Sequence, residues 1–138
     1  MSMTPSLYQP TSKKTDMPQP KIDDIVILGT SEAEIFNVKK SPDRLISGDP
    51  DITNSVYFRS QDKRFTSGIW ESTPGKFVCI YEEDEFYYML SGKVVITDSL
   101  GNSKTFVPGD SIVVPAGFTG HWEVLEPTKK FFAHYMPG

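Results

Sequence analysis

Short runs of β-prone residues, separated by turn residues, dominate the chain from Val56 to its end. The runs include VYFRS, KFVCIY, EFYYML, KVVITD and KKFFAHY, and the breaks include TPG, SLGN, PGD and PAG. Turn residues recur about every 8–12 positions, which is typical of β-sandwiches and barrels, and no stretch keeps the 3.6-residue period of a helix. The pattern therefore predicts an all-β sandwich or barrel.

The chain of 138 residues favours one folded domain preceded by less regular segments. Residues 1–20 are rich in Ser, Thr, Pro and Lys, and we predict a flexible tail because such a segment buries too little to offset its ordering. Residues 21–50 are predicted to form an N-terminal extension. Its apolar run from Ile25 to Leu28, ended by Gly29, predicts a short strand. The β-rich domain is placed at residues 51–138.

Composition excludes several classes of partner. The net charge is −4, so no basic face for a nucleic acid is expected. No run approaches the roughly 18 apolar residues that span a bilayer, and the N-terminus lacks the apolar segment of a secretory signal. Cys79 is the only cysteine, which excludes an intramolecular disulfide. We therefore expect a cytoplasmic protein without a membrane or nucleic-acid partner.

Glycines, prolines and one acidic residue match the spacing of a known pair of motifs. Six residues separate Glu85 from Gly92, and five residues, DSIVV, separate Gly109 from the segment Pro115-Ala116-Gly117. In these spacings the chain resembles the cupins. The segments YEEDEFYYMLSG and FVPGDSIVVPAGFTGHWEVLEPTKK are similar to the ureidoglycine-aminohydrolase-like and ethanolamine-utilisation-like cupins. The resemblance implies a double-stranded β-helix, or jelly-roll barrel, with an N-terminal extension.

The same resemblance identifies four positions where a cupin would hold its metal. Glu85 keeps the carboxylate, but the three histidine positions fall on Cys79, Tyr81 and Gly120. His121 lies one residue further along, and its side chain would point to the opposite face of a strand. Ureidoglycine aminohydrolases hold manganese with histidines and a carboxylate. The departures predict that this chain holds no metal and uses no cofactor.

Alternation along the strands predicts a pocket inside the barrel. Its expected residues are Trp70, Cys79, Tyr81, Glu85, Tyr87, Met89, Trp122 and His134. Aromatic walls with one carboxylate suit a small polar or cationic ligand. Burial among aromatic rings should raise the pKa of Glu85, which makes it the candidate catalytic acid or base and the expected partner of the tyrosine hydroxyls.

Other side chains are expected to have structural roles. Cys79 is predicted to be a buried, inert thiol. Glu82, Glu83 and Asp84 are predicted to form a solvated loop, and Lys129 and Lys130 to be charges that protect a strand edge. Positive φ angles at turns are expected for Gly75, Gly92, Gly109 and Gly117.

Three functions are compatible with these features, and the sequence does not decide whether the chain is an enzyme. The favoured one is a metal-free cupin that binds a small polar or cationic metabolite. The alternatives are an enzyme of nitrogenous-metabolite catabolism resembling ureidoglycine aminohydrolase, and an accessory interaction protein. The resemblance also implies a homodimer, in which residues 25–30 could cross to the partner as a swapped strand.

Overall fold

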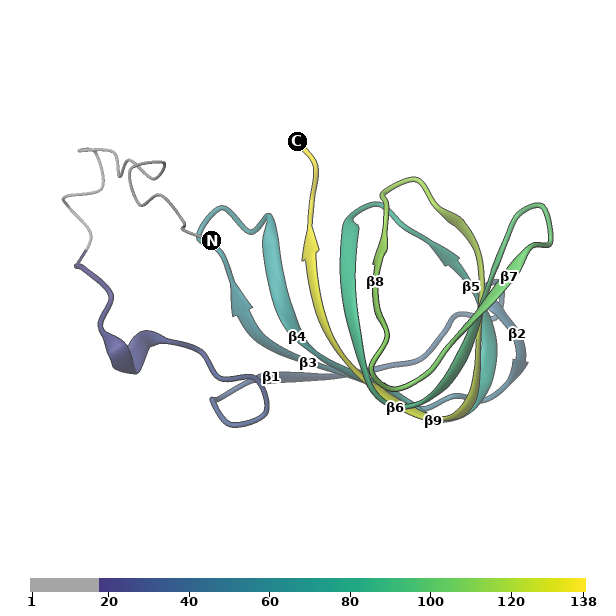
Figure 1. The fold of residues 1–138 in the computed structure, drawn as a ribbon, viewed down its shortest axis with the longest axis horizontal. Helices are drawn as coiled ribbons and strands as arrows, with labels where there is room; N and C mark the ends of the chain where they lie inside the picture. Colours follow the sequence, from purple (N-terminus) through teal and green to yellow (C-terminus); the bar gives the residue numbers. More distant parts are fainter. Residues whose placement is uncertain (1–17) are drawn as a thin grey trace.

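Nine strands and one short 3-10 helix make up the regular structure of residues 18–138, the part of the chain that the computed structural model describes (Figure 1). The strands are β1 (Glu34–Val38), β2 (Leu45–Gly48), β3 (Ile52–Arg59), β4 (Phe65–Ser72), β5 (Gly75–Ile80), β6 (Asp84–Asp98), β7 (Ser103–Phe106), β8 (Ser111–Val114) and β9 (Thr119–Tyr135). No helix in this part of the chain has the length and apolarity to cross a membrane. The predicted all-β class is confirmed.

Two long antiparallel strands, β6 and β9, run through both halves of a curled barrel. In the first half, residues 84–91 of β6 pair with β8 and with the end of β9, which continues through β4 and β3 to β1. In the second half, residues 93–98 of β6 pair with β7 and with the start of β9, which continues through β5 to β2. This arrangement is the predicted jelly roll.

The two long strands change from one half to the other at a β-bulge around Gly92. The register of β6 against β9 shifts at Ser91 and again at Lys93. Gly92 has φ +95°, and an added Cβ would collide with Thr128 on β9. A glycine is therefore required both by the backbone angle and by the close approach of the two strands.

The glycine predictions hold at three of four positions. Gly92, Gly109 and Gly117 have the expected positive φ angles. Gly75 does not, and the prediction for it was wrong. A side chain is excluded there because the ring of Pro50 packs against the glycine where a Cβ would stand.

The core lies between the two halves, where alternate residues of facing strands meet. Met89 and Val94 of β6 are completely buried, and Trp122 and Val124 of β9 each keep 2% of their surface exposed. A buried residue at every second position is the pattern expected of strands with one face in a core. The cluster joins residues of both halves into one core.

The N-terminal extension departs from the prediction. Ile25 to Leu28 form no strand; the chain turns there, with the Ser31 hydroxyl accepting a hydrogen bond from the Ile27 amide at 2.9 Å. The apolar run predicted a strand, but within the described residues no strand edge pairs with it. The extension instead contributes β1 and β2, which pair inside the same chain. The predicted tail, residues 1–20, lies almost wholly outside the described residues.

Candidate functional site

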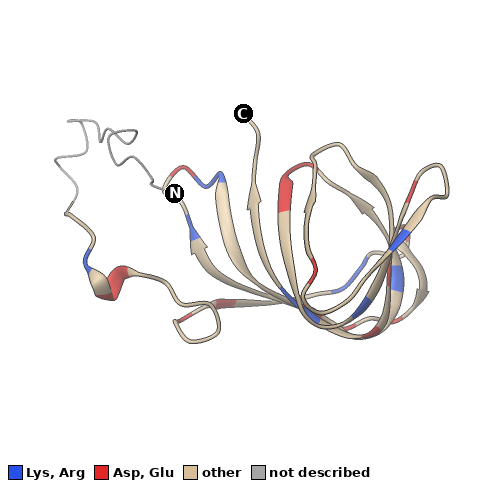
Figure 2. Cartoon of the chain, in the orientation of Figure 1, with Lys and Arg blue, Asp and Glu red and all other residues tan. Residues whose placement is uncertain are grey.

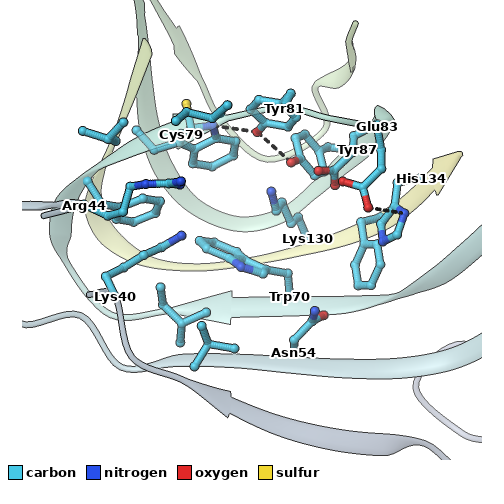
Figure 3. A pocket seen from close by; sticks show the side chains of 18 residues that line it. Lys40, Arg44, Asn54, Trp70, Cys79, Tyr81, Glu83, Tyr87, Lys130 and His134 are labelled. Carbon is cyan, nitrogen blue, oxygen red and sulfur yellow. Dashed lines mark hydrogen bonds and ion pairs between the residues drawn. The ribbon is translucent and has the colours of Figure 1, made fainter. Parts of the chain in front are cut away.

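A cavity of about 270 Å³ lies between the two halves of the barrel (Figure 3). Its lining includes seven of the eight predicted pocket residues: Trp70, Cys79, Tyr81, Glu85, Tyr87, Trp122 and His134. Met89 is not among them, because its side chain is packed into the core without any exposed surface. The sequence did not predict five polar or charged lining residues: Lys40, Arg44, Asn54, Glu83 and Lys130.

A second hollow of about 480 Å³ lies between β7 and β8 and is lined mostly by apolar side chains. Its titratable lining groups are Asp98 and Lys104. The Asp98 carboxylate already accepts hydrogen bonds from the amides of Leu100 and Asn102 in the adjoining turn. The smaller cavity is therefore the better candidate site, because it gathers the buried titratable groups.

Lys130 is the unexpected residue of the cavity. We predicted an edge charge, but its side chain points inward and only 3% of its surface is exposed. Its Nζ lies 3.1 Å from the ring centroid of Tyr87, 4.0 Å from that of Trp122 and 4.4 Å from that of Trp70. Burial lowers its pKa well below the ordinary value for lysine. The neighbouring Lys129 is exposed, as predicted.

The sequence did contain a signal for the inward position of the Lys130 side chain. Phe132 and His134 lie at every second position after Lys130 and share its face, since all three line the cavity. Alternation along β9 therefore predicts an inward Lys130 once Phe132 or His134 is placed inside.

Three aromatic side chains form a buried hydrogen-bonded group beside the lysine. The hydroxyl groups of Tyr81 and Tyr87 are 2.7 Å apart, and Nε1 of Trp122 donates to the Tyr81 hydroxyl at 2.9 Å. Glu85 was expected to be the partner of both hydroxyls; its carboxyl group forms a side-chain hydrogen bond with Tyr87 and acts on Tyr81 only through its charge. Burial raises the pKa of both tyrosines, so the two hydroxyl groups stay protonated.

Glu85 is half-buried at the cavity wall. As the sequence indicated, burial raises the pKa of its carboxyl group, and the charges of Lys130 and His134 oppose that rise. A raised pKa makes the protonated form of this carboxyl group more populated than in an exposed glutamate, which suits a general acid. Its catalytic role stays a prediction.

The two ends of the cavity differ in charge (Figure 3). Lys40 and Arg44 lie at one end, and Lys40 Nζ is 4.6 Å from the ring centroid of Phe77. Glu83 and His134 lie at the other end, with Nδ1 of His134 3.4 Å from a carboxylate oxygen of Glu83. Glu83 was predicted to be solvated but is half-buried by this contact. Lys130 lies between the two ends.

The cupin positions for metal ligands do not fit a transition metal here. Gly120 cannot carry a ligand, because a Cβ would collide with the carbonyl oxygen of Thr97 on the neighbouring β6. Burial raises the pKa of the Cys79 thiol to about 11, which makes its deprotonation for metal binding more costly. His121 does not line the cavity. Among residues 18–138, no three His, Cys, Asp or Glu side chains gather closely enough to hold a metal ion.

A jelly-roll barrel built on two shared strands, with its polar cavity between the halves, defines a cupin. The chain belongs to the EutQ-like cupin domain family, whose model matches residues 59–132. That match covers the strands that carry most of the cavity wall. No curated protein matches the sequence of the chain.

Solved structures agree with this family. A protein of unknown function from the DUF861 family of Pseudomonas syringae pv. tomato is 25% identical with a TM-score of 0.67, over 74% of this chain and 44% of that one. The EutQ protein of Clostridium difficile is 20% identical with a TM-score of 0.57, over 72% and 80% of the two chains. A Salmonella typhimurium ethanolamine utilization protein, EutQ, is 14% identical with a TM-score of 0.58, over 80% and 100%. The likeness to the two EutQ structures is one of fold.

Lysine, arginine and acidic residues are interspersed along the strands in Figure 2. The cavity lining also carries both signs of charge, with three basic residues, Lys40, Arg44 and Lys130, and two acidic ones, Glu83 and Glu85.

Proposed function

We propose that this cupin binds a small metabolite with a carboxylate group in the cavity of its barrel, without a metal. The observation that carries the proposal is the pair of basic side chains, Lys40 and Arg44, at one end of the half-open cavity. The acidic lining residues offset this charge only in part, because Glu83 contacts His134 and burial favours the protonated form of Glu85. An anion can therefore pair with Lys40 and Arg44.

The cavity also limits the size of the ligand. Its volume of about 270 Å³ is at the lower end of small-molecule sites, which hold drug-sized ligands in roughly 300–1,000 Å³. A metabolite with a few carbon atoms fits this space better than a nucleotide or a sugar phosphate.

The aromatic residues no longer argue for a cationic ligand. The faces of Trp70, Tyr87 and Trp122 would attract a ligand cation, but Nζ of Lys130 already lies over all three rings. A second cation in the same place would be repelled by Lys40 and Arg44.

Catalysis is the second candidate function, and one observation favours it: Glu85 and Lys130 face the same cavity and influence each other's pKa. The reaction of ureidoglycine aminohydrolases relies on a metal, and the donors of this site do not fit one. An enzyme of nitrogenous-metabolite catabolism would therefore have to use Glu85, Lys130 and the tyrosines themselves. Identical pH profiles of activity in the protein and in Glu85→Gln would remove Glu85 from such a mechanism.

Calorimetric titration with a matched pair of ligands tests the binding proposal. Pyruvate carries a carboxylate, and hydroxyacetone is a neutral molecule of similar size. We expect pyruvate to bind more tightly, and Lys40→Gln to lose about tenfold in affinity, because the charge-assisted contact is lost. The control is Lys39→Gln, whose lysine is exposed and pairs with Asp49 and Asp51. Equal binding of the two ligands contradicts the proposal.

A further inference from the structure

We propose that Lys130 is an amine nucleophile that forms a reversible imine with an aldehyde or ketone group of the ligand. The inference rests on the proposed function and deepens it, because it makes the ligand class a small oxo acid. It assigns Lys130 a covalent role that is separate from charge pairing.

The first argument is the position of the amine. Nζ of Lys130 is enclosed by three aromatic rings and faces the cavity. Within residues 18–138, Lys130 has neither a hydrogen-bond acceptor nor a carboxylate within ion-pair distance. The three ring faces attract an ammonium group but do not replace a hydrogen-bond acceptor or a carboxylate, so burying the charged form of this lysine is costly.

The second argument is the protonation state that this position favours. Burial lowers the pKa of Lys130, and the charge of Lys40 adds to the effect, while Glu85 and Cys79 oppose it. The lowered pKa makes the neutral amine, which has a free lone pair, more populated than in an exposed lysine. A desolvated lysine beside another cationic group is the arrangement that activates amines for imine formation.

The third argument is that one titratable residue of the same cavity, Glu85, can move the protons. The Nζ lone pair attacks the carbonyl carbon, and the C=O π electrons move to oxygen, giving a carbinolamine after proton transfer from nitrogen to that oxygen. Glu85 then protonates the hydroxyl group, the C–O bond breaks and water leaves. The nitrogen returns a proton to Glu85, and the sum is amine plus carbonyl giving imine plus water. The step needs no oxidant, reductant or cofactor.

The geometry of the cavity also orients an oxo acid. Lys40 and Arg44 lie on one side of Lys130, where they can hold a carboxylate, while Glu85 also lines the cavity. A carboxylate held there brings the neighbouring carbonyl carbon toward the amine. Cys79 is a poor competing nucleophile, because its thiol stays protonated at neutral pH.

Reductive trapping tests the proposal. The full chain is incubated with pyruvate and sodium cyanoborohydride at neutral pH, denatured and analysed by mass spectrometry with peptide mapping. We expect one adduct, heavier by the mass of pyruvate less one oxygen, on Lys130. The expected yield with hydroxyacetone is about tenfold lower, because it lacks the carboxylate that Lys40 and Arg44 would hold.

Adjacent lysines provide the matched control. Lys130→Met and Lys130→Arg should give no adduct at this position, and the exposed Lys129→Met should react like the unmodified sequence. Mapping the adduct in the unmodified sequence does not depend on the folding of any variant. Labelling spread over surface lysines, without preference for Lys130, overturns the imine.

Calorimetry separates the two proposals. Pyruvate that binds without a Lys130 adduct overturns the imine and leaves the proposed binding function standing. Absence of both binding and adduct contradicts both. An adduct on Lys130, together with tighter binding of pyruvate than of hydroxyacetone, supports both.

Discussion

The burial of Lys130 inside the barrel lowers the free energy of unfolding by an amount that depends on pH. A buried polar group without a full set of hydrogen bonds costs about 1–3 kcal/mol in proteins. Since its pKa is lowered in the folded protein, the unfolded chain binds a proton that the folded protein releases. Stability due to this group therefore rises with pH, from the folded pKa up to the ordinary value of 10.5.

We expect Lys130→Met to stabilise the fold by about 1–3 kcal/mol at pH 7, because the methionine has no charge to desolvate. The gain should shrink as the pH approaches 10, where the unfolded lysine also begins to lose its proton. Urea unfolding of both proteins between pH 6 and 10 measures the difference. Lys129→Met is the control, and a gain that stays constant with pH contradicts the lowered pKa.

The Tyr81 hydroxyl is the second residue whose removal has a definite expected result. It accepts a hydrogen bond from Nε1 of Trp122 and forms one with the Tyr87 hydroxyl. Trp122 and Tyr87 are both buried. Tyr81→Phe leaves Nε1 of Trp122 without an acceptor and removes one partner of the Tyr87 hydroxyl, and it should destabilise the fold by about 1–3 kcal/mol. Tyr88→Phe, in which an exposed tyrosine loses its hydroxyl, should change the free energy of unfolding by less than about 0.5 kcal/mol. Equal effects in denaturant unfolding would be inconsistent with the hydrogen-bonded group.

At the scale of strands, alternation predicted much of the site correctly. Cys79, Tyr81, Tyr87 and Trp122 all line the cavity, because β5, β6 and β9 keep a regular period of two through these residues. The prediction failed for Lys130 because the charge of its side chain was given more weight than its place in the alternation. The sequence also predicted a positive φ at Gly92, but at a turn between two strands, whereas the structure places this glycine at a β-bulge within β6.

The cationic end of the cavity could not be predicted in the same way. Lys40 and Arg44 come from the segment between β1 and β2. They reach the cavity because β1 pairs with β3 and β2 pairs with β5, and such long-range pairings leave no periodic signal near the lysine and the arginine themselves. The prediction of a strand at Ile25–Leu28 was wrong because strand pairing is also a long-range property. A strand needs a neighbouring strand edge as well as β-prone residues.

Two glycines have the same backbone angle but different surroundings. Alanine substitutions at both therefore distinguish the energetic cost of the backbone angle from that of steric crowding. Gly92 and Gly109 both have φ +95°, but a Cβ at Gly92 would collide with Thr128, whereas at Gly109 it would meet nothing within 4 Å. Gly109→Ala should cost about 1–2 kcal/mol of unfolding free energy from the backbone angle alone. Gly92→Ala should cost about 1–3 kcal/mol more, because β6 and β9 must move apart. Equal losses in thermal or urea unfolding would mean that the strand crossing tolerates a methyl group.

At the scale of the whole molecule, one outer face of the barrel is apolar across three neighbouring strands. Phe86 pairs with Val113 on β8 and with Ala133 on β9, and the rings of Tyr88 and Phe131 stack with centroids 6.3 Å apart. Val113 is 66% exposed and Phe86 43%. Contiguous exposed apolar patches of this kind mark interaction surfaces. An apolar patch of this kind can pair with the same patch on another copy, so a second copy of the chain is a suitable occupant.

We therefore expect a homodimer that buries this outer face, and we expect Phe86→Glu to shift it toward the monomer because the new charge would be desolvated in the interface. Analytical ultracentrifugation at micromolar concentration measures the shift. Leu100→Glu, in the exposed β6–β7 hairpin, is the control and should leave the dimer intact. A dimer formed by exchange of residues 25–30, the swapped strand considered from the sequence, would behave differently. In that dimer the double substitution Ile25→Ser and Ile27→Ser would cause dissociation, and Phe86→Glu would not. A protein that sediments as a monomer at these concentrations contradicts both forms of the dimer, and the cavity, built from one chain, would then act alone.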